Sequence, residues 1–443
     1  MNHAVVGSAY RMLADEARAL LTRLETVQPF ALQMTMVPAA AVPARALAAI
    51  EQHVARVRIA VGQQVRDYLS WLARACRGGV SPAEAQSGLA LLRIRFNQLL
   101  SQYDIFADVL SQRSEHDNGI WLAGLDAAAA DAMALRGGFF VPPPAVCYLD
   151  RGRGAAIRRA RTRLPGGDPN PVAVVRVPRE RMVGSGIASS LVHEVGHQCS
   201  ASLGLVESLR PLVQGMQRTR GPDRIAWVLF ERWLSEVIAD FWGVAKVGIA
   251  ATTGLIGVVS LPSAFVFRVA LDDPHPFPWI RVKISCALGK ALYPHSQWNK
   301  LAALWESFYP TDGLEEQKRR LLTMLESNLG AFVNMLVLHR PKALCGHSLM
   351  EVVASPDRHA RHLQGLYTSW RATPRLMRLA SPTLALAAVG QARFDGRMSP
   401  EHESRTVGAL LRHWALRGHG PGQTARTTAV RMNSESAVSI QQE

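Results

Sequence analysis

The chain has 443 residues, of which 48% are hydrophobic, so it can bury a large core. That length fits two or three domains, or a single catalytic unit with helical additions, and the composition indicates a globular protein. Five cysteines are scattered along the chain without any C-x-x-C pair, which indicates a reducing compartment rather than a disulfide framework.

The formal charge is +15, and arginine far outnumbers lysine. This charge favours acidic surfaces, nucleic acid or anionic lipid as neighbours, although a chain-wide bias toward arginine explains it without any partner. Tyrosine and phenylalanine do not alternate with the basic residues, so the sequence does not indicate a stacking platform for single strands. Nucleic acid is therefore not the partner that we expect.

The first 24 residues contain charged side chains where an export signal needs an apolar core, namely Arg11, Asp15, Glu16 and Arg18. This segment is predicted to be a helix and not a signal peptide. The prediction that follows is a cytoplasmic protein.

Residues 1–136 are predicted to form a lead domain of antiparallel helices. Apolar side chains recur at helical spacing over 44–75, with Ile59 off the stripe, and Ser81-Pro82-Ala83-Glu84 is a capping box that starts a second helix. Helical patterns continue over 105–110 and 121–135. Nothing in this region suggests chemistry, so we expect a scaffold, with interaction or substrate gating as the alternative.

Glycines 137–138 and prolines 142–144 mark a domain boundary. Six of the thirteen residues from Arg151 to Arg163 are arginine, which predicts a solvated surface or one for an acidic partner; Gly152-x-Gly154 is too short for a phosphate loop. Residues 171–178 are rich in β-branched side chains and closed by prolines, and they are predicted to be a strand.

The motif H-E-x-x-H occupies residues 193–197 within a helix-compatible segment. Two histidines four apart share one face of a helix, where His193 and His197 can bind one zinc ion. Glu194 follows the first histidine, within reach of a zinc-bound water whose proton it can take. The alternative is a pair of histidines on a helix face without metal.

A second predicted helix, over 226–246, supplies the acidic partner of this motif. Glu236 and Asp240 lie four apart, so Glu236 is the expected third zinc ligand and Asp240 is expected to accept a hydrogen bond from a ligating imidazole. Glu231 is the fallback ligand. The alternative is a solvated charge ladder that includes Arg232.

The third stretch surrounds His275, which lies among three prolines in a stiff, non-helical segment that ends at Arg281. A histidine held in this way can approach a zinc ion from its open side and stabilise a developing oxyanion, or act as a displaceable fourth ligand. Read alone, the segment is equally well a turn with an exposed histidine.

The order H-E-x-x-H, E-x-x-x-D and H-P-x-x-x-x-R resembles the gluzincin metallopeptidases, most closely the CAAX-prenyl-protease and HtpX-type zinc endopeptidases. The resemblance covers about 173–288. It implies one Zn²⁺ per chain held by His193, His197 and Glu236, with Glu194 as general base and His275 beside the cleft. Asp240 ends the second motif and Arg281 ends the third, and the resemblance implies that both support the metal ligands without binding the metal.

The resemblance also implies that the predicted strand borders the cleft. An edge strand there binds an extended substrate by β-augmentation, and the residues expected to do so are Val174, Val175 and Arg176. The helix that carries the H-E-x-x-H motif is expected to start at Gly184-Ser185-Gly186, where small residues allow another backbone to approach closely. The expected substrate is a protein or peptide.

Residues 247–267 form the only long uncharged run and would just span a bilayer. Glycine, threonine, serine and Pro262 dilute its apolarity, so a buried core segment is expected and membrane association is possible but not favoured.

The fold class expected is mostly α, an α+β zincin-like core with a small β-sheet edge, flanked by N- and C-terminal helical regions. His339, Cys345 and His347 lie close together, but their irregular spacing favours accidental proximity over a second metal site. The predicted division is a helical lead domain, a metallopeptidase core, a helical C-terminal region and a polar, disordered tail: 1–136, 137–290, 291–417 and 418–443.

The function predicted from sequence is a zinc-dependent endopeptidase that acts through a zinc-activated water. Two alternatives belong to other classes. One is a catalytically inactive helical scaffold or regulatory protein, and the other is a basic protein that binds nucleic acid or a membrane surface.

Overall fold

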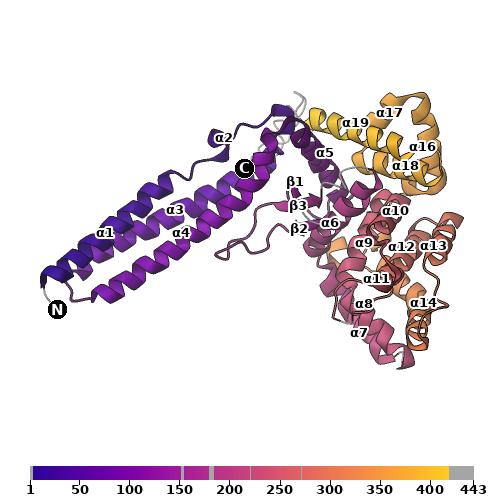
Figure 1. Cartoon of the computed structure of the whole chain (residues 1–443), viewed down its shortest axis with the longest axis horizontal. Coiled ribbons are helices and arrows are strands. Elements are labelled where there is room, and N and C mark those ends of the chain that lie inside the picture. Colours follow the sequence, from indigo (N-terminus) through magenta and orange to yellow (C-terminus); the bar gives the residue numbers. More distant parts are fainter. Residues whose placement is uncertain (1–2, 151–153, 179–183, 220, 271, 419–443) are drawn as a thin grey trace, which may run out of the picture. The chain divides into compact units, whose positions relative to one another are not determined.

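The computed structural model describes residues 3–150, 154–178, 184–219, 221–270 and 272–418. The fold is mostly α-helical with one small three-stranded sheet, as predicted (Figure 1). Contacts divide the chain into two compact units, residues 1–120 with 159–173 and residues 121–158 with 174–443. Residues 121–136, which the sequence grouped with the lead domain, thus belong to the second unit. From residue 419 on, the predicted tail lies outside the described residues, as does part of the arginine-rich segment.

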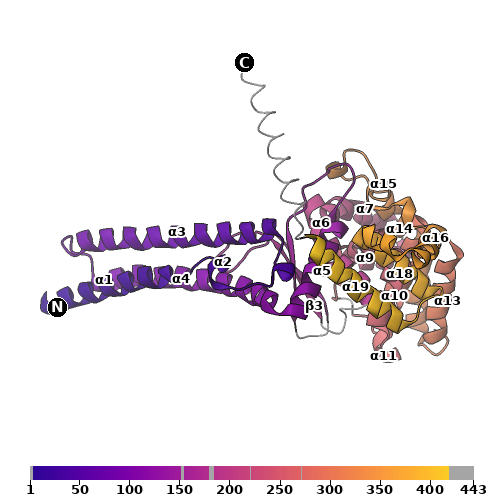
Figure 2. The same ribbon diagram turned by 90° about the horizontal axis from the view of Figure 1, so that it is seen from above.

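The first unit is built on long helices that run side by side in both views (Figures 1 and 2). They are α1 (His3–Glu25), α3 (Ala44–Ala75) and α4 (Pro82–Ser111), with the short α2 (Phe30–Gln33) between α1 and α3. Their apolar stripes meet in one core that includes Leu20, Val65 and Leu89. Packing of these stripes, rather than helix propensity alone, stabilises such long helices.

Two local predictions for this unit are confirmed. Ser81 caps α4 by accepting a hydrogen bond from the Glu84 backbone, and the Glu84 side chain reaches back to the Ser81 backbone. Ile59 stands off the apolar stripe of α3 and is 63% exposed.

The second unit contains the sheet and most of the helices. The sheet consists of β1 (Ala145–Asp150), β2 (Ala156–Arg158) and β3 (Ala173–Pro178) in the order β1-β3-β2. Strand β2 pairs antiparallel with β3, with Ile157 opposite Val175. The prediction of a strand near 171–178 is therefore confirmed.

The second unit is mostly helical. Its helices are α5 (His116–Met133), whose first turns belong to the first unit, α6 (Ser185–Leu203), α7 (Leu205–Thr219), α8 (Arg224–Arg232), α9 (Leu234–Val247), α10 (Ile249–Val259), α11 (Ser263–Val266), α12 (Pro278–Leu292), α13 (Ser296–Phe308), α14 (Glu316–Val337), α15 (Leu349–Val353), α16 (Ala360–Ala372), α17 (Pro374–Leu379), α18 (Pro382–Phe394) and α19 (Pro400–Gly418). The single helix predicted over 226–246 is two helices that meet at Trp233, α8 and α9.

Helices α6 and α9 are in close contact because Gly196 has no side chain at their crossing. A Cβ built on Gly196 would lie 2.9 Å from the Cα of Ala239 and 2.9 Å from the Cβ of Trp242. The two helices that carry the H-E-x-x-H and E-x-x-x-D motifs are therefore neighbours in the core.

The uncharged run 247–267 is divided among three helices and is not one long span. Gly248, with φ of +58°, separates α9 from α10, and Ser260 ends α10 before the short α11. Most of α10 is buried, as expected for a core segment. Among the described residues, no helix has both the length and the apolarity that crossing a membrane requires.

Candidate metal centre

Helix α6 carries the two histidines of the H-E-x-x-H motif on one face. The helix begins after Gly184, whose φ of +63° favours glycine, and ends at the left-handed Gly204. One helical turn separates His193 from His197, and their rings lie edge to face with centroids 4.8 Å apart. The predicted helix is therefore present, and its geometry places both imidazoles together.

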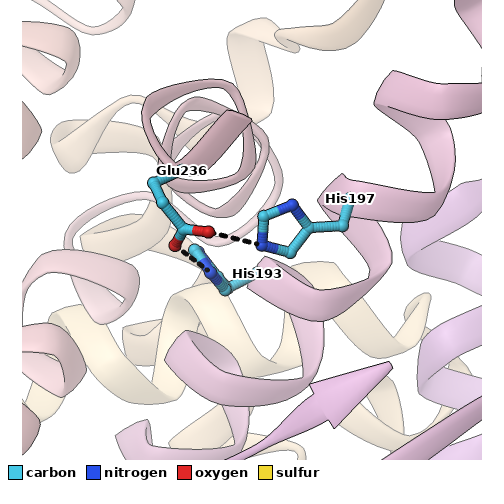
Figure 3. A group of neighbouring side chains, drawn as sticks. All are labelled: His193, His197 and Glu236. Atoms are coloured by element: carbon cyan, nitrogen blue, oxygen red, sulfur yellow. Dashed lines mark ion pairs between the residues drawn. The ribbon is translucent and has the colours of Figure 1, made fainter. Parts of the chain in front are cut away.

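Glu236 projects from α9 toward both rings (Figure 3). One carboxylate oxygen, Oε2, lies 3.3 Å from Nε2 of His193, and the other, Oε1, lies 3.3 Å from Nε2 of His197. The potential ligand atoms of the three residues all lie within 4.8 Å of one another. Two imidazole nitrogens and a carboxylate form the donor set that zinc accepts at catalytic sites.

The far nitrogen of each imidazole is held by a residue of α9. Nδ1 of His193 lies 2.8 Å from Oδ1 of Asp240, and Nδ1 of His197 lies 3.3 Å from Oγ of Ser235. Because both Nδ1 atoms are engaged, both Nε2 atoms face Glu236. Hydrogen bonds of this kind orient metal-binding histidines and increase their basicity.

Arg281, from α12, donates hydrogen bonds to both acidic residues of α9, Asp240 and Glu236. Its Nε donates to Oδ2 of Asp240 at 2.7 Å and its Nη2 donates to Oδ1 at 3.0 Å, a bidentate pair. Nη2 also lies 3.4 Å from Oε2 of Glu236. Arg281 of the third sequence motif thus contacts the two carboxylates of the second motif, which also contact the histidines of the first.

The charges of this network explain its pKa values. Burial lowers the pKa of His193, but the Asp240 and Glu236 carboxylates outweigh burial and raise it to about 9. Burial raises the pKa of Asp240, but Arg281 and His193 outweigh this and lower it to about 2. The same balance, with the two histidines and Arg281 opposing burial, lowers the pKa of Glu236. The site is therefore a set of charges that stabilise one another.

Glu194 lines a cavity of about 170 Å³ together with His193, Glu236 and His275. Its side chain is buried, and burial raises its pKa, opposed by the positive charges of His193 and His197. A carboxylate with a raised pKa exchanges protons more readily near neutral pH. Small and apolar residues line other parts of the cavity, among them Gly243, Ala251, Leu255 and Val258.

His275 reaches the cavity from a segment outside the helices. Its backbone N–H donates to Oδ1 of Asp273 at 2.9 Å, and its Nδ1 lies 2.8 Å from the same oxygen. The other ring nitrogen, Nε2, lies 3.6 Å from Oε2 of Glu236. The side chain remains 54% exposed, so it stands at the open side of the triad.

The prediction of a substrate-binding edge strand at Val174, Val175 and Arg176 is wrong. Strand β3 is the middle strand, so its backbone groups already pair on both sides. Arg176 also forms an ion pair with Asp150 at 3.4 Å. The outer strand β2 contacts α6 instead, and the preceding Gly154 and Ala155 line the cavity.

The structure places the other sequence candidates outside the triad. Glu231, the fallback ligand, accepts hydrogen bonds from Gln214 and Gln217, both at 2.7 Å. Arg232 donates to the carbonyl of Asp272. His339 and His347 belong to no cluster of potential metal ligands within the described part of the chain.

Two supporting residues had no assigned role in the sequence analysis, Ser235 and Asp273. Asp273 stands two residues before His275, a spacing at which aspartate accepts from a backbone N–H, so an Asx-turn pattern was present. Ser235 carries no such signal, because its contact with His197 depends on the packing of α9 against α6.

Comparison with known proteins gives no assignment, because no family model, no curated protein and no solved structure matches the chain. The geometry of the site is therefore the basis on which function is inferred.

Proposed function

We propose that this protein is a zinc-dependent endopeptidase whose centre is formed by His193, His197 and Glu236. The observation that carries the proposal is that the ligand atoms of these three residues lie within 4.8 Å of one another, beside a cavity that His193, Glu236 and Glu194 line. The donor set fits zinc, since both Nε2 atoms and the carboxylate point toward a common space while Asp240 and Ser235 hold the Nδ1 atoms.

A zinc ion bound there would supply Lewis acidity, lowering the pKa of a coordinated water and polarising a carbonyl. Glu194 takes a proton from the attacking water as the water oxygen bonds to the peptide carbonyl carbon. It then returns this proton to the amide nitrogen as the C–N bond breaks, which leaves an amine and a carboxylic acid that loses its remaining proton to solvent at neutral pH. His275, held by Asp273, donates a hydrogen bond from Nε2 to the developing oxyanion.

Strand β2 is the element that supports binding of an extended peptide in this proposal. It is an outer strand of the sheet, it contacts α6, and Gly154 and Ala155 lead from it into the cavity. A substrate backbone would pair with 156–158 by β-augmentation. The small and apolar lining beyond the triad favours a small apolar side chain next to the scissile bond.

The test uses the purified chain, a fluorescently labelled unfolded protein as substrate, and elemental analysis of bound zinc. Glu194→Gln should keep the zinc and lose cleavage by a factor of at least about 10², the contribution of a general base. His193→Ala should lose both. Glu231→Gln is the matched control, because Glu231 is an acidic residue of the neighbouring helix that bonds only outside the centre, and it should keep both.

Normal turnover in Glu194→Gln would remove Glu194 from the mechanism. Zinc content that depends on His193 without cleavage of any unfolded substrate would favour the inactive scaffold. Salt-sensitive retention on heparin or anionic vesicles, unchanged in His193→Ala, would favour the basic binding protein.

A further inference from the structure

A second cavity lies in the C-terminal helical region and shares no residue with the metal centre. It has a volume of about 590 Å³ and is formed by α16, α17, α19 and the turn before α19. This volume is within the range of small-molecule sites, roughly 300–1,000 Å³. We name it the arginine pocket because Arg371, Arg378, Arg397 and Arg405 all line it.

The rim of the arginine pocket is strongly basic. All four arginines are exposed, and His402 lines the same cavity. No aspartate or glutamate is among the described residues that line it. Guanidinium groups at one concave surface repel one another unless an anion lies between them.

These arginines differ from others in the same region, which have acidic partners. Arg358 pairs with Asp357 at 2.7 Å, Arg340 pairs with Glu351, and Arg393 pairs with Glu403. Within the described ranges, the four rim arginines form no ion pair with a carboxylate at salt-bridge distance. Their charge is therefore available to a ligand.

Glu401 is the acidic group that interacts electrostatically with Arg405, and its own bonds lie elsewhere. Hydrogen bonds from the Ser399 side chain and from backbone at the start of α19 lower the pKa of Glu401, and Arg405 adds a smaller effect. Glu401 does not line the pocket. It balances at most one of the four guanidinium charges.

Arg397 is held in place by neutral groups. Its Nη2 donates to Oγ1 of Thr368 at 2.8 Å, its Nη1 donates to the carbonyl of Gln364 at 3.4 Å, and its guanidinium carbon lies 5.2 Å from the ring centre of Tyr367. These contacts orient the side chain without neutralising it. A fixed, uncompensated guanidinium suits recognition of a carboxylate or phosphate.

The floor of the pocket is apolar. It is formed by Trp370, Met377, Met398 and Leu410, which are all buried, with Ala409 at its edge. Methionine and tryptophan adapt to hydrocarbon groups of varied shape. The pocket thus combines an apolar base with a cationic rim.

We infer that the arginine pocket binds one free anionic amphiphile, a molecule with a carboxylate or phosphate head and a short apolar body. The head lies among the guanidinium groups and the body lies on the Trp370, Met377 and Met398 floor. A bilayer is a different occupant, because the apolar floor is buried at the base of a concave site and is reached by a single chain rather than by a lipid surface.

Isothermal titration of the full chain with octyl phosphate, at concentrations below micelle formation, tests this inference. Binding should saturate at one molecule per chain and weaken as salt concentration rises. Octyltrimethylammonium and octyl glucoside, which have the same apolar body with a cationic or neutral head, should not bind. Inorganic phosphate alone should bind at least tenfold more weakly, because it lacks the apolar body.

The double variant Arg378→Gln/Arg405→Gln removes two rim charges and should weaken octyl phosphate binding at least tenfold. The matched control is Arg375→Gln, an exposed arginine of α17 that does not line the pocket, and it should bind like the parent chain. If circular dichroism shows that the double variant is unfolded, Arg405→Gln alone should weaken binding severalfold.

Several results would overturn the inference. They are the absence of saturable binding, equal binding of the three octyl compounds, equal binding of inorganic phosphate, and an equal loss in Arg375→Gln. Binding to phosphatidylglycerol vesicles without binding of free octyl phosphate would also overturn it, because the occupant would then be a lipid surface. The metal centre does not enter this test, and His193→Ala should leave octyl phosphate binding unchanged.

Discussion

Gly196 controls the distance between the two helices that carry the metal ligands, and Gly196→Ala tests that control. The added Cβ would lie 2.9 Å from the Cα of Ala239 and 3.0 Å from its carbonyl oxygen. Both are backbone atoms that cannot rotate away, so α6 must move from α9. Overpacking of this kind costs about 1–3 kcal/mol, while alanine in a helix interior recovers about 1 kcal/mol relative to glycine.

Gly215→Ala separates these two contributions. Gly215 lies inside α7, and a Cβ there would have no heavy atom within 4 Å apart from its chain neighbours and the backbone of its own helix. Gly215→Ala should therefore raise the free energy of unfolding by about 1 kcal/mol, through the higher helix propensity of alanine alone. The free energies of unfolding of the two variants should therefore differ by about 1–3 kcal/mol, the steric cost at Gly196.

The same displacement should affect zinc binding. His193 and His197 move with α6 while Glu236 stays on α9, so the Nε2 to carboxylate distances of 3.3 Å increase. We expect zinc affinity to fall by about 10–100-fold, as when the support of metal ligands is removed. Guanidinium denaturation followed by circular dichroism gives the stabilities, and competition with a chromogenic chelator gives the affinities. Equal stability and equal zinc affinity in the two variants would refute the reasoning.

Three further predictions concern the polar network. Asp240→Asn leaves the buried Arg281 guanidinium without its bidentate partner, so urea denaturation should show a loss of about 3–5 kcal/mol. Because the pKa of Asp240 is lowered to about 2 from 3.8, its ionisation stabilises the fold above the unfolded pKa. About 2 kcal/mol should be lost as pH falls from 4 to 2 in chelator-treated protein, and not in Asp240→Asn. Free zinc at a hundred times its dissociation constant should stabilise the protein by about 2.7 kcal/mol in thermal unfolding, and not in His197→Ala.

The helices could be predicted from sequence because their signals are local. The stripe of α3 and the capping box of Ser81 depend on residues three or four positions apart. The place of β3 in the sheet depends instead on the strands that pair with it, and these strands have weaker sequence signals than the helices. Strand β2 has only three residues, next to an arginine-rich segment, so nothing local indicated that β3 would be enclosed on both sides.

The same distinction applies to the site. Spacing alone placed His193 beside His197 and Glu236 beside Asp240, because four residues make about one helical turn. Spacing could not show that Ser235 would approach His197 or that Glu231 would turn away toward Gln214. Those contacts depend on how α6, α7 and α8 pack around α9, and this packing cannot be read from the sequence of any one helix.

The division of roles between the two carboxylates of α9 follows from their partners. Asp240 accepts two hydrogen bonds from Arg281 and one from His193 Nδ1, so its oxygens are committed to holding other groups. Glu236 lies one turn earlier on α9, and its two oxygens each face an imidazole Nε2. Exchanging the two residues would place the shorter aspartate side chain opposite the imidazoles and the longer glutamate side chain against the Arg281 guanidinium. The order of the two residues along α9 therefore selects Glu236 as the ligand and Asp240 as its support.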